Sequence, residues 1–366
     1  MTDFFYDRLT QLDHSFLVYE GPNAPMHVGA TQIFEAAPLR RPEGGIDLER
    51  IEAYVLSRLH RIPRYRQRLS YTPIERHPIW IDDARFNIHY HVRHTRLPRP
   101  GDERLLKRMI GRIFSQHLDR GKPLWEMWLI EGLEGDRIAV VSKIHHCMVD
   151  GISGVDLLAA LLTADPIEKG DPPHAWLARP APSAAQLARD ETERALRVPL
   201  DAASALWDLA RDDDHARDRL ATRLGALGKF VTGSGGATAS STSINQPVGP
   251  YRRVDWLPMD LRRVRSVAKQ LGGTVNDVVL TMVSGALGGA LRHLGQEVPH
   301  EPLRVLVPVS VRRAEEFGAP GNRVSLWLVP LPIDQPDARR RFDHIRATTE
   351  ALKRGGDAAG GAVDSA

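Results

Sequence analysis

The sequence predicts a mixed α/β protein built from two α/β units, on three observations. Strand-like and helix-like segments alternate over residues 1–165. A Pro/Ala-rich and then charged stretch follows over 166–244, and a second series of helices and strands occupies 245–366. A chain of 366 residues with 42% hydrophobic content is long enough for two domains and a sizeable core. We therefore expect an N-terminal domain, a linker with its own helices, and a C-terminal domain.

Periodicity predicts the elements of the first unit. Alternating or continuous apolar segments indicate strands, and apolar spacing near 3.6 residues indicates helices. The last two strands are expected to pair around the turn EGD. We expect strands at 26–35, 86–97, 124–133 and 137–146, and helices at 48–59, 105–117 and 151–164.

The second unit begins with an amphipathic helix that ends at a glycine. Thr274 then caps a new helix, and Asp277 stands at the third helical position, where a carboxylate completes a capping box. The stretch 233–243 reads as a flexible spacer, and the Gly/Ala-rich tail after Arg354 is not expected to pack. We expect helices at 261–273 and 278–294, and strands at 303–311 and 324–332.

Composition excludes several classes of function. The net charge is only +3 and no dense Lys/Arg block appears, so we expect no nucleic-acid partner. One cysteine fits a reducing compartment. The N-terminus lacks a signal-peptide pattern, and no apolar run approaches the ~20 residues of a membrane span. We expect a cytoplasmic protein, with contact to a membrane surface left open.

The stretch HHCMVDG at 145–151 concentrates reactive residue types. Neighbouring side chains of a strand point to opposite faces, which disfavours His145 and His146 as a metal pair. Cys147 is either a nucleophile or a small buried hydrophobe. A histidine at a strand end before a helix suits a general base at neutral pH. Asp150 occupies the N-cap of that helix, and Gly151 keeps the space beside the base clear. The residues alone leave base catalysis and a structural strand–helix turn equally open.

A second group of histidines, at 89, 91 and 94, offers another metal hypothesis. His89 and His91 have the i, i+2 spacing that places two ligands on one face of a strand. The alternative is that His89, His91 and His94 are ordinary histidines of a sheet. The residues favour this second interpretation over a metal site.

HHCMVDG resembles HHxxxDG, the signature of CoA-dependent acyltransferases with a chloramphenicol-acetyltransferase-like fold. The remaining blocks are similar to the bacterial wax ester synthase and acyl-CoA:diacylglycerol acyltransferase family, in the same order along the chain. The resemblance covers nearly the whole chain outside 166–243 and the last dozen or so residues. The blocks are LTQLDHSFLVYE (9–20), PMHVGATQIFE (25–35), IPRYRQRL (62–69), HYHVRH (89–94), LDRGKPLWEMWLIEGL (118–133), NQPVGPYRR (245–253), TVNDVVL (274–280), VPVSVR (307–312) and GNRVSLWLVPLP (321–332).

The resemblance assigns roles to individual residues. It implies that His146 is the general base, that His145 is its motif partner, that Asp150 is mainly structural and that Gly151 is the motif glycine. For Trp125 of the PLW motif, core packing and a substrate contact are both open. The remaining motif residues are Pro123 and Leu124 of PLW, and Asn276 and Asp277 of the ND pair, of which Asn276 is a candidate for a polar contact into the reaction cleft.

The resemblance implies two acetyltransferase-like α/β domains with a reaction cleft between them. The family continues beyond the end of this chain, so the second domain is expected to be incomplete. The implied activity is transfer of a fatty acyl group from acyl-CoA, as substrate, to diacylglycerol or a long-chain alcohol. No metal or redox cofactor is expected, and a membrane or lipid-droplet surface is a partner to consider. Two alternatives are an impaired relative that only binds lipid or acyl-CoA, and an acyltransferase with a small polar acceptor.

Overall fold

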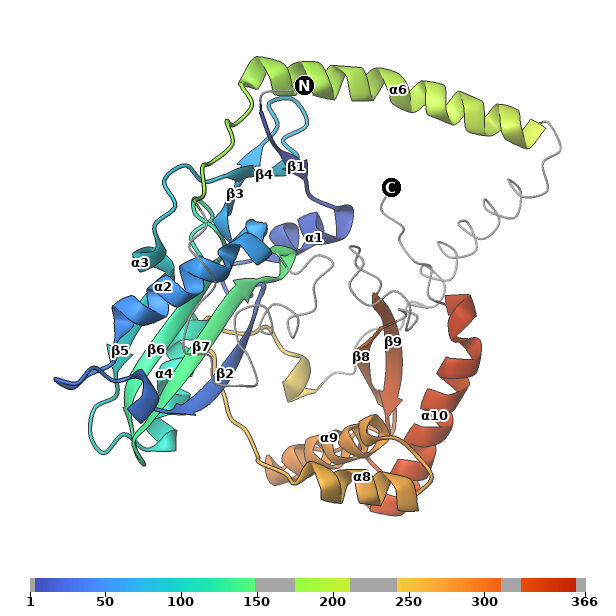
Figure 1. Cartoon of the computed structure of the whole chain (residues 1–366). Coiled ribbons are helices and arrows are strands. Elements are labelled where there is room, and N and C mark those ends of the chain that lie inside the picture. The colour runs from blue at the N-terminus through green and yellow to red at the C-terminus, as the bar shows by residue number, and fades with distance from the viewer. Residues whose placement is uncertain (1–3, 149–174, 211–241, 311–323, 360–366) are drawn as a thin grey trace.

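The computed structural model describes residues 4–148, 175–210, 242–310 and 324–359. Within these ranges the elements form two groups (Figure 1). Each group has its own hydrophobic core residues. The helix expected at 151–164 lies outside the described residues.

Four strands form the central sheet of the first group, in the order β2-β7-β6-β5. β7 pairs antiparallel with both neighbours, whereas β5 and β6 run parallel. Nearly every residue of β7 is buried, which explains its almost continuous apolar sequence. The strands are β2 (His27–Glu35), β5 (Val92–Arg96), β6 (Trp125–Leu133) and β7 (Arg137–His145).

Helices cover both faces of this sheet. Ala139 and Val141 of β7 belong to one core with the apolar face of α4 (Glu103–Phe114). Ile138 and Val140 point to the other face, into a core shared with α1 (Gln11–Tyr19) and α2 (Leu48–Arg58). Short 3-10 turns connect these elements at Ala37–Leu39, Leu59–Arg61, Pro63–Arg66 and His146–Met148.

A smaller antiparallel sheet, in the order β1-β4-β3, adjoins the first. Part of the expected linker packs against it: Leu187 of α6 (Ala184–Ala210) joins the core of Ile79 and Ile81. Figure 1 shows α6 running past this sheet. The strands are β1 (Asp7–Arg8), β3 (Gln67–Tyr71) and β4 (Pro78–Asp82).

The strand expected at 86–97 is only half right. Residues Ile88–His91 form the helical turn α3, and only Val92–Arg96 form β5. The side chain of Asn87 accepts the backbone N–H of His89 at 3.0 Å, which starts a helical turn in place of a strand. Alternation over this stretch therefore gave the wrong element at its beginning.

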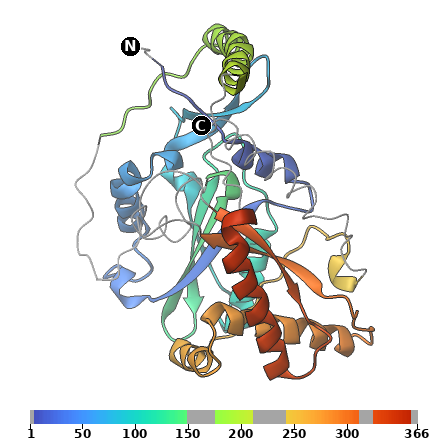
Figure 2. The ribbon, with the colours of Figure 1, turned by 90° about the vertical axis from the view of Figure 1, so that its right-hand side faces the viewer.

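The second group contains a two-stranded antiparallel sheet and three helices. The predicted capping box at Thr274 and Asp277 is confirmed. Helix α10 packs along α9 and β9 (Figure 2). It also extends past Arg354, into the tail that was not expected to pack. The elements are α8 (Leu261–Gln270), α9 (Val275–His293), β8 (Leu303–Ser310), β9 (Val324–Leu331), α10 (Ala338–Ala359) and, before them, the 3-10 turn Ser243–Asn245.

An extended segment at 251–256 leads from the first group to the second. Val254 and Trp256 pack against α4, and the backbone N–H of Arg252 donates to Ser115 Oγ at 2.8 Å. A Cβ on Gly111 would lie 2.6 Å from the carbonyl oxygen of Arg252, so only glycine allows this approach. Among the described helices none is long and apolar enough by itself to cross a membrane, and α8 with α9 meets that measure only as a pair bent by 97°.

Candidate functional site

The two histidines of HHCMVDG lie where β7 ends. His145 is the last residue of β7, and His146 opens the 3-10 turn that follows. The N–H of His145 donates to Leu124 O at 2.9 Å, and the N–H of His146 donates to Met26 O at 2.8 Å. The corner is therefore held by the backbones at the starts of both neighbouring strands, β6 and β2.

His146 presents a half-buried imidazole beside α1. Its ring stacks on Phe16, with 3.8 Å between ring centroids and 20° between planes. Burial and the nearby charge of His145 lower the pKa of His146 below its ordinary value of 6.5. At neutral pH the ring is therefore uncharged and can accept a proton, which a general base requires.

His145 is almost fully buried and has a defined tautomer. The backbone N–H of Cys147 donates to its Nδ1 at 3.2 Å, so in the neutral ring the proton resides on Nε2. Nε2 faces Glu20 Oε1 at 3.5 Å. That contact is too long for a normal hydrogen bond, and Nε2 has no hydrogen-bond partner within the described ranges. The interaction with Glu20 is electrostatic.

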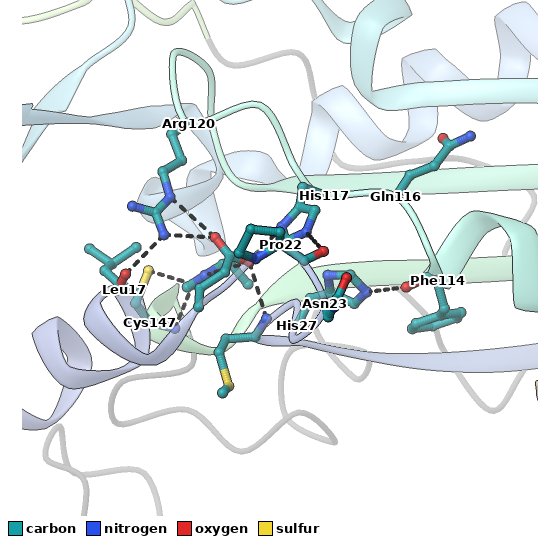
Figure 3. A network of polar contacts seen from close by, with 12 residues as sticks. Leu17, Pro22, Asn23, His27, Phe114, Gln116, His117, Arg120 and Cys147 are labelled. Atoms are coloured by element: carbon teal, nitrogen blue, oxygen red, sulfur yellow. Dashed lines mark hydrogen bonds and ion pairs between the residues drawn. The ribbon is translucent and has the colours of Figure 1, made fainter. Parts of the chain in front are cut away.

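Glu20, at the end of α1, forms the centre of a polar network. Figure 3 shows Arg120, His117 and Cys147 in this region. Arg120 donates to its Oε2 from Nη2 at 2.8 Å and from Nε at 3.2 Å. The N–H of Met26 donates to Oε1 at 3.1 Å, and His117 Nδ1 lies 3.4 Å from the same oxygen. Burial opposes the charge, but His145 and Arg120 outweigh it and hold the pKa of Glu20 well below its usual range.

Sequence reasoning missed Glu20 and Arg120. Both lie in segments that resemble the family, LTQLDHSFLVYE and LDRGKPLWEMWLIEGL, but they are a hundred residues apart. One glutamate and one arginine at that separation have no spacing that points to a pair. Only the fold brings them together.

Cys147 is buried in the same corner, with its Sγ 3.0 Å from His145 Nδ1. Burial and the charge of Asp13 raise the pKa of the Cys147 thiol far above its usual range. The thiol therefore stays protonated, which argues against a nucleophile because the thiolate is the reactive form.

The PLW residues, Pro123, Leu124 and Trp125, pack beside the two histidines of the motif. Pro123, Leu124 and Trp125 are all buried, and Leu124 O holds the N–H of His145. Trp125 stacks between Tyr65 and His91, with 4.5 Å between centroids on each side, and its Nε1 donates to Tyr65 O at 2.8 Å. Trp125 thus packs in the core, which was one of the two readings left open for it.

The ND pair lies in the second group. Asp277 accepts both the N–H and the Oγ1–H of Thr274 at 2.7 Å, and Thr349 Oγ1 of α10 at 2.7 Å. Burial opposes its charge, but these hydrogen bonds lower the pKa of Asp277. Its role is to fix the start of α9 to α10. Asn276 is exposed beside it.

The structure separates the histidines of the alternative metal hypothesis. His89 pairs with Glu52 at 2.9 Å, and His94 pairs with Glu131 at 2.6 Å. His91 donates from Nδ1 to Trp125 O at 2.8 Å. Within the described ranges, no three His, Cys, Asp or Glu side chains are grouped to hold a metal ion. Asp150 and Gly151 lie outside the described residues.

The mixed α/β fold thus places the histidine pair of HHCMVDG at the end of the central strand β7, as expected for an acyltransferase with this motif. Residues 9–279 match the family model "Wax ester synthase/diacylglycerol acyltransferase catalytic domain". The chain belongs to this family, as the motifs predicted.

Two relatives come from Mycobacterium tuberculosis. A "Putative diacyglycerol O-acyltransferase" is 32% identical over 344 residues, which cover 92% of this chain and 65% of that protein. The "Probable diacyglycerol O-acyltransferase tgs1" is 31% identical over 362 residues, which cover 96% of this chain and 72% of that protein. The chain thus spans about two thirds of the length of the relatives it matches.

Two solved structures confirm the predicted fold class. The wax ester synthase/diacylglycerol acyltransferase from Marinobacter aquaeolei VT8 is 28% identical, with a TM-score of 0.63 over 95% of this chain and 72% of that chain. The first condensation domain of the CDA synthetase is 17% identical, with a TM-score of 0.53 over 96% of this chain and 77% of that one. The second likeness concerns the fold alone.

Proposed function

We propose that this protein is an acyl-CoA-dependent O-acyltransferase. It moves a fatty acyl group from acyl-CoA to diacylglycerol, giving triacylglycerol, or to a long-chain alcohol, giving a wax ester. Family membership and the names of the relatives support this reaction class. The observation that supports the proposal most directly is that His146 presents a half-buried, uncharged imidazole at the end of strand β7.

In the proposed reaction His146 takes the proton from the acceptor hydroxyl. The resulting alkoxide oxygen forms a bond to the thioester carbonyl carbon, and the carbon–sulfur bond then breaks. CoA leaves as a thiolate and takes the proton back from His146, so the ring returns to its neutral form. We propose no resident metal or redox cofactor, because the thioester already supplies the activation for acyl transfer.

The test is release of free thiol from palmitoyl-CoA, with and without diacylglycerol or hexadecanol. We expect release that depends on the acceptor and is lost in His146→Ala, since a general base contributes roughly 10²–10⁴ in rate. His145→Ala should lose less activity, because His145 supports the position of the base but does not itself take the proton. Full activity of His146→Ala would refute the assignment. Binding without turnover, or turnover only with small polar alcohols, would refute the proposed reaction.

We also propose that the protein works in the cytoplasm, at the surface of a membrane or lipid droplet. Val18 and Tyr19 at the end of α1 are 66% and 69% exposed, and the same helix carries Phe16 against His146. Apolar side chains beside the base suit a substrate held at an interface. Flotation with anionic liposomes tests this, and Val18→Asp should reduce co-flotation. No co-flotation of the native protein at low salt would contradict it.

A further inference from the structure

A cavity of about 640 Å³ lies beside α3, apart from the histidine corner. The end of β4, α3, the loop before β6 and the segment before α6 form its walls. Its volume is in the range of small-molecule sites. The polar side chains that matter for its chemistry are Arg68, Arg85, Asn87, Tyr90, Lys122 and Arg179.

Two of the three carboxylates that line this cavity, Asp82 and Asp119, are engaged by side-chain donors, whereas the third, Asp83, accepts the backbone N–H of Arg85 at 3.0 Å. Asp82 accepts Arg179 Nε and Nη2, each at 2.9 Å, and Gln67 Nε2 at 3.1 Å. The Asp119 carboxylate accepts hydrogen bonds from the Lys122 ammonium and from the backbone N–H of Gly121. Asp82 and Asp119 therefore have little remaining capacity to receive a cationic ligand.

Two guanidinium groups keep free donors. Among the described residues, none accepts a hydrogen bond from the exposed Arg85 guanidinium, whose backbone N–H alone is bound, to Asp83 at 3.0 Å. Arg68 reaches only its neighbour Leu69 O at 3.3 Å, and Asp83 at the long distance of 3.9 Å. The Tyr90 hydroxyl also has no hydrogen bond within the described ranges. Unused donors thus outnumber unused acceptors.

We propose that this cavity binds a phosphate-bearing ligand through Arg85 and Arg68. A guanidinium presents several N–H donors in a planar fork that matches phosphate oxygens. The Tyr90 hydroxyl and the Asn87 side-chain amide add neutral donors on the same wall. The phosphate comes either from the nucleotide end of CoA or from free phosphate.

One loop connects the cavity to the candidate active site. Asp119, Gly121 and Lys122 line the cavity, while Arg120 between them reaches Glu20 in the histidine corner. Leu124, two residues further, holds His145 through its carbonyl oxygen. If the phosphate belongs to acyl-CoA, an assignment that rests on the proposed function, its nucleotide is held on one side of this loop and its thioester on the other.

Direct binding tests the cavity independently of any activity. Adenosine 3′,5′-bisphosphate and inorganic phosphate are titrated calorimetrically into the native chain, Arg85→Glu and the control Arg104→Glu. Arg104 is an exposed arginine of α4 outside the cavity, so its substitution makes the same change in charge. We expect Arg85→Glu to weaken binding about tenfold or more, Arg85→Lys to recover part of it, and the control to change little. Binding of neither probe, or equal weakening in the control, overturns the proposal.

Two thioesters then identify the source of the phosphate. Palmitoyl-CoA carries the phosphates, and the palmitoyl thioester of N-acetylcysteamine does not. If CoA is the ligand, Arg85→Glu raises KM for palmitoyl-CoA about tenfold and leaves KM for the N-acetylcysteamine thioester unchanged. If free phosphate is the ligand, both KM values are unaffected although the titration still shows binding. Absence of turnover with both thioesters refutes the proposed function but not the cavity, which the titration decides.

Discussion

The buried carboxylate of Glu20 and the guanidinium of Arg120 form a two-point hydrogen-bonded pair beneath the histidine corner, at 2.8 and 3.2 Å. The carboxylate is 5% exposed, whereas the Arg120 side chain is 38% exposed. Arg120 therefore compensates a charge that water cannot reach. His145 and the N–H of Met26 share the other oxygen of the same carboxylate.

We expect Arg120→Met to lower the free energy of unfolding by about 2–3 kcal/mol, because it leaves a buried carboxylate uncompensated. This is less than the ~3–5 kcal/mol for a fully buried pair, because the Arg120 side chain is partly exposed. Glu20→Gln combined with Arg120→Met should be less destabilised than Arg120→Met alone, since no buried charge then remains. Urea unfolding of the three variants measures this. A double variant less stable than Arg120→Met would contradict the explanation.

The acid limb of the pH–rate profile should lie below pH 6.5. Burial lowers the pKa of His146 in the folded protein, and a base works only while it is neutral. Activity is therefore present above the folded pKa and falls as the pH drops through it. The measurement is kcat/KM for palmitoyl-CoA between pH 5 and 8. An acid limb at or above 6.5 would mean that His146 is not the titrating base.

Cys147→Ala should keep most of the activity. The Cys147 thiol stays protonated in its buried position, and the N–H that fixes the tautomer of His145 belongs to the backbone. The substitution removes neither the base nor the contact that orients its neighbour. The measurement compares thiol release by the native protein and by Cys147→Ala. A stoichiometric acyl group trapped on Cys147 and seen by mass spectrometry would instead indicate a covalent acyl-enzyme.

His91 should make the fold sensitive to acid. Burial lowers the pKa of His91 from 6.5 to about 4, so the unfolded chain binds its proton first as the pH falls. The contribution of His91 is present above pH 6.5 and is lost between 6.5 and about 4. This difference corresponds to about 3 kcal/mol.

His91→Phe tests this, because it keeps a ring between Trp125 and Phe86 but removes the titration. At pH 7 the variant should be less stable by about 1 kcal/mol, since Trp125 O loses its donor. Its stability should then fall less steeply toward pH 4 than that of the native chain. Parallel pH dependences in urea unfolding would exclude His91 as the cause.

Gly111→Ala should destabilise the packing of the segment 251–256 on α4. The new Cβ would lie 2.6 Å from the carbonyl oxygen of Arg252, and such overpacking costs about 1–3 kcal/mol. Gly289→Ala in α9 is the matched control, because nothing lies within 4 Å of its Cβ position. The control should gain up to about 1 kcal/mol from helix propensity. Equal stabilisation of both variants would show that the close approach does not exist.

Elements with a strong local signal were predictable from the sequence. The apolar run of β7 and the capping box at Thr274 and Asp277 depend on neighbours a few residues away. The stretch 86–97 failed because the Asn87 side chain starts a helical turn, which hydrophobic alternation does not encode. The histidine corner was recognised because its residues are contiguous in the chain.

The sequence by itself therefore determined the family, most elements and the identity of the candidate base. The tertiary structure alone decided that Glu20 and Arg120 meet under His145, that Trp125 is buried between two rings, and that His89, His91 and His94 have three separate partners. The reason is physical. Local periodicity and caps depend on contacts within a few residues, whereas pairing, burial and pKa depend on side chains that chain folding brings together from distant positions.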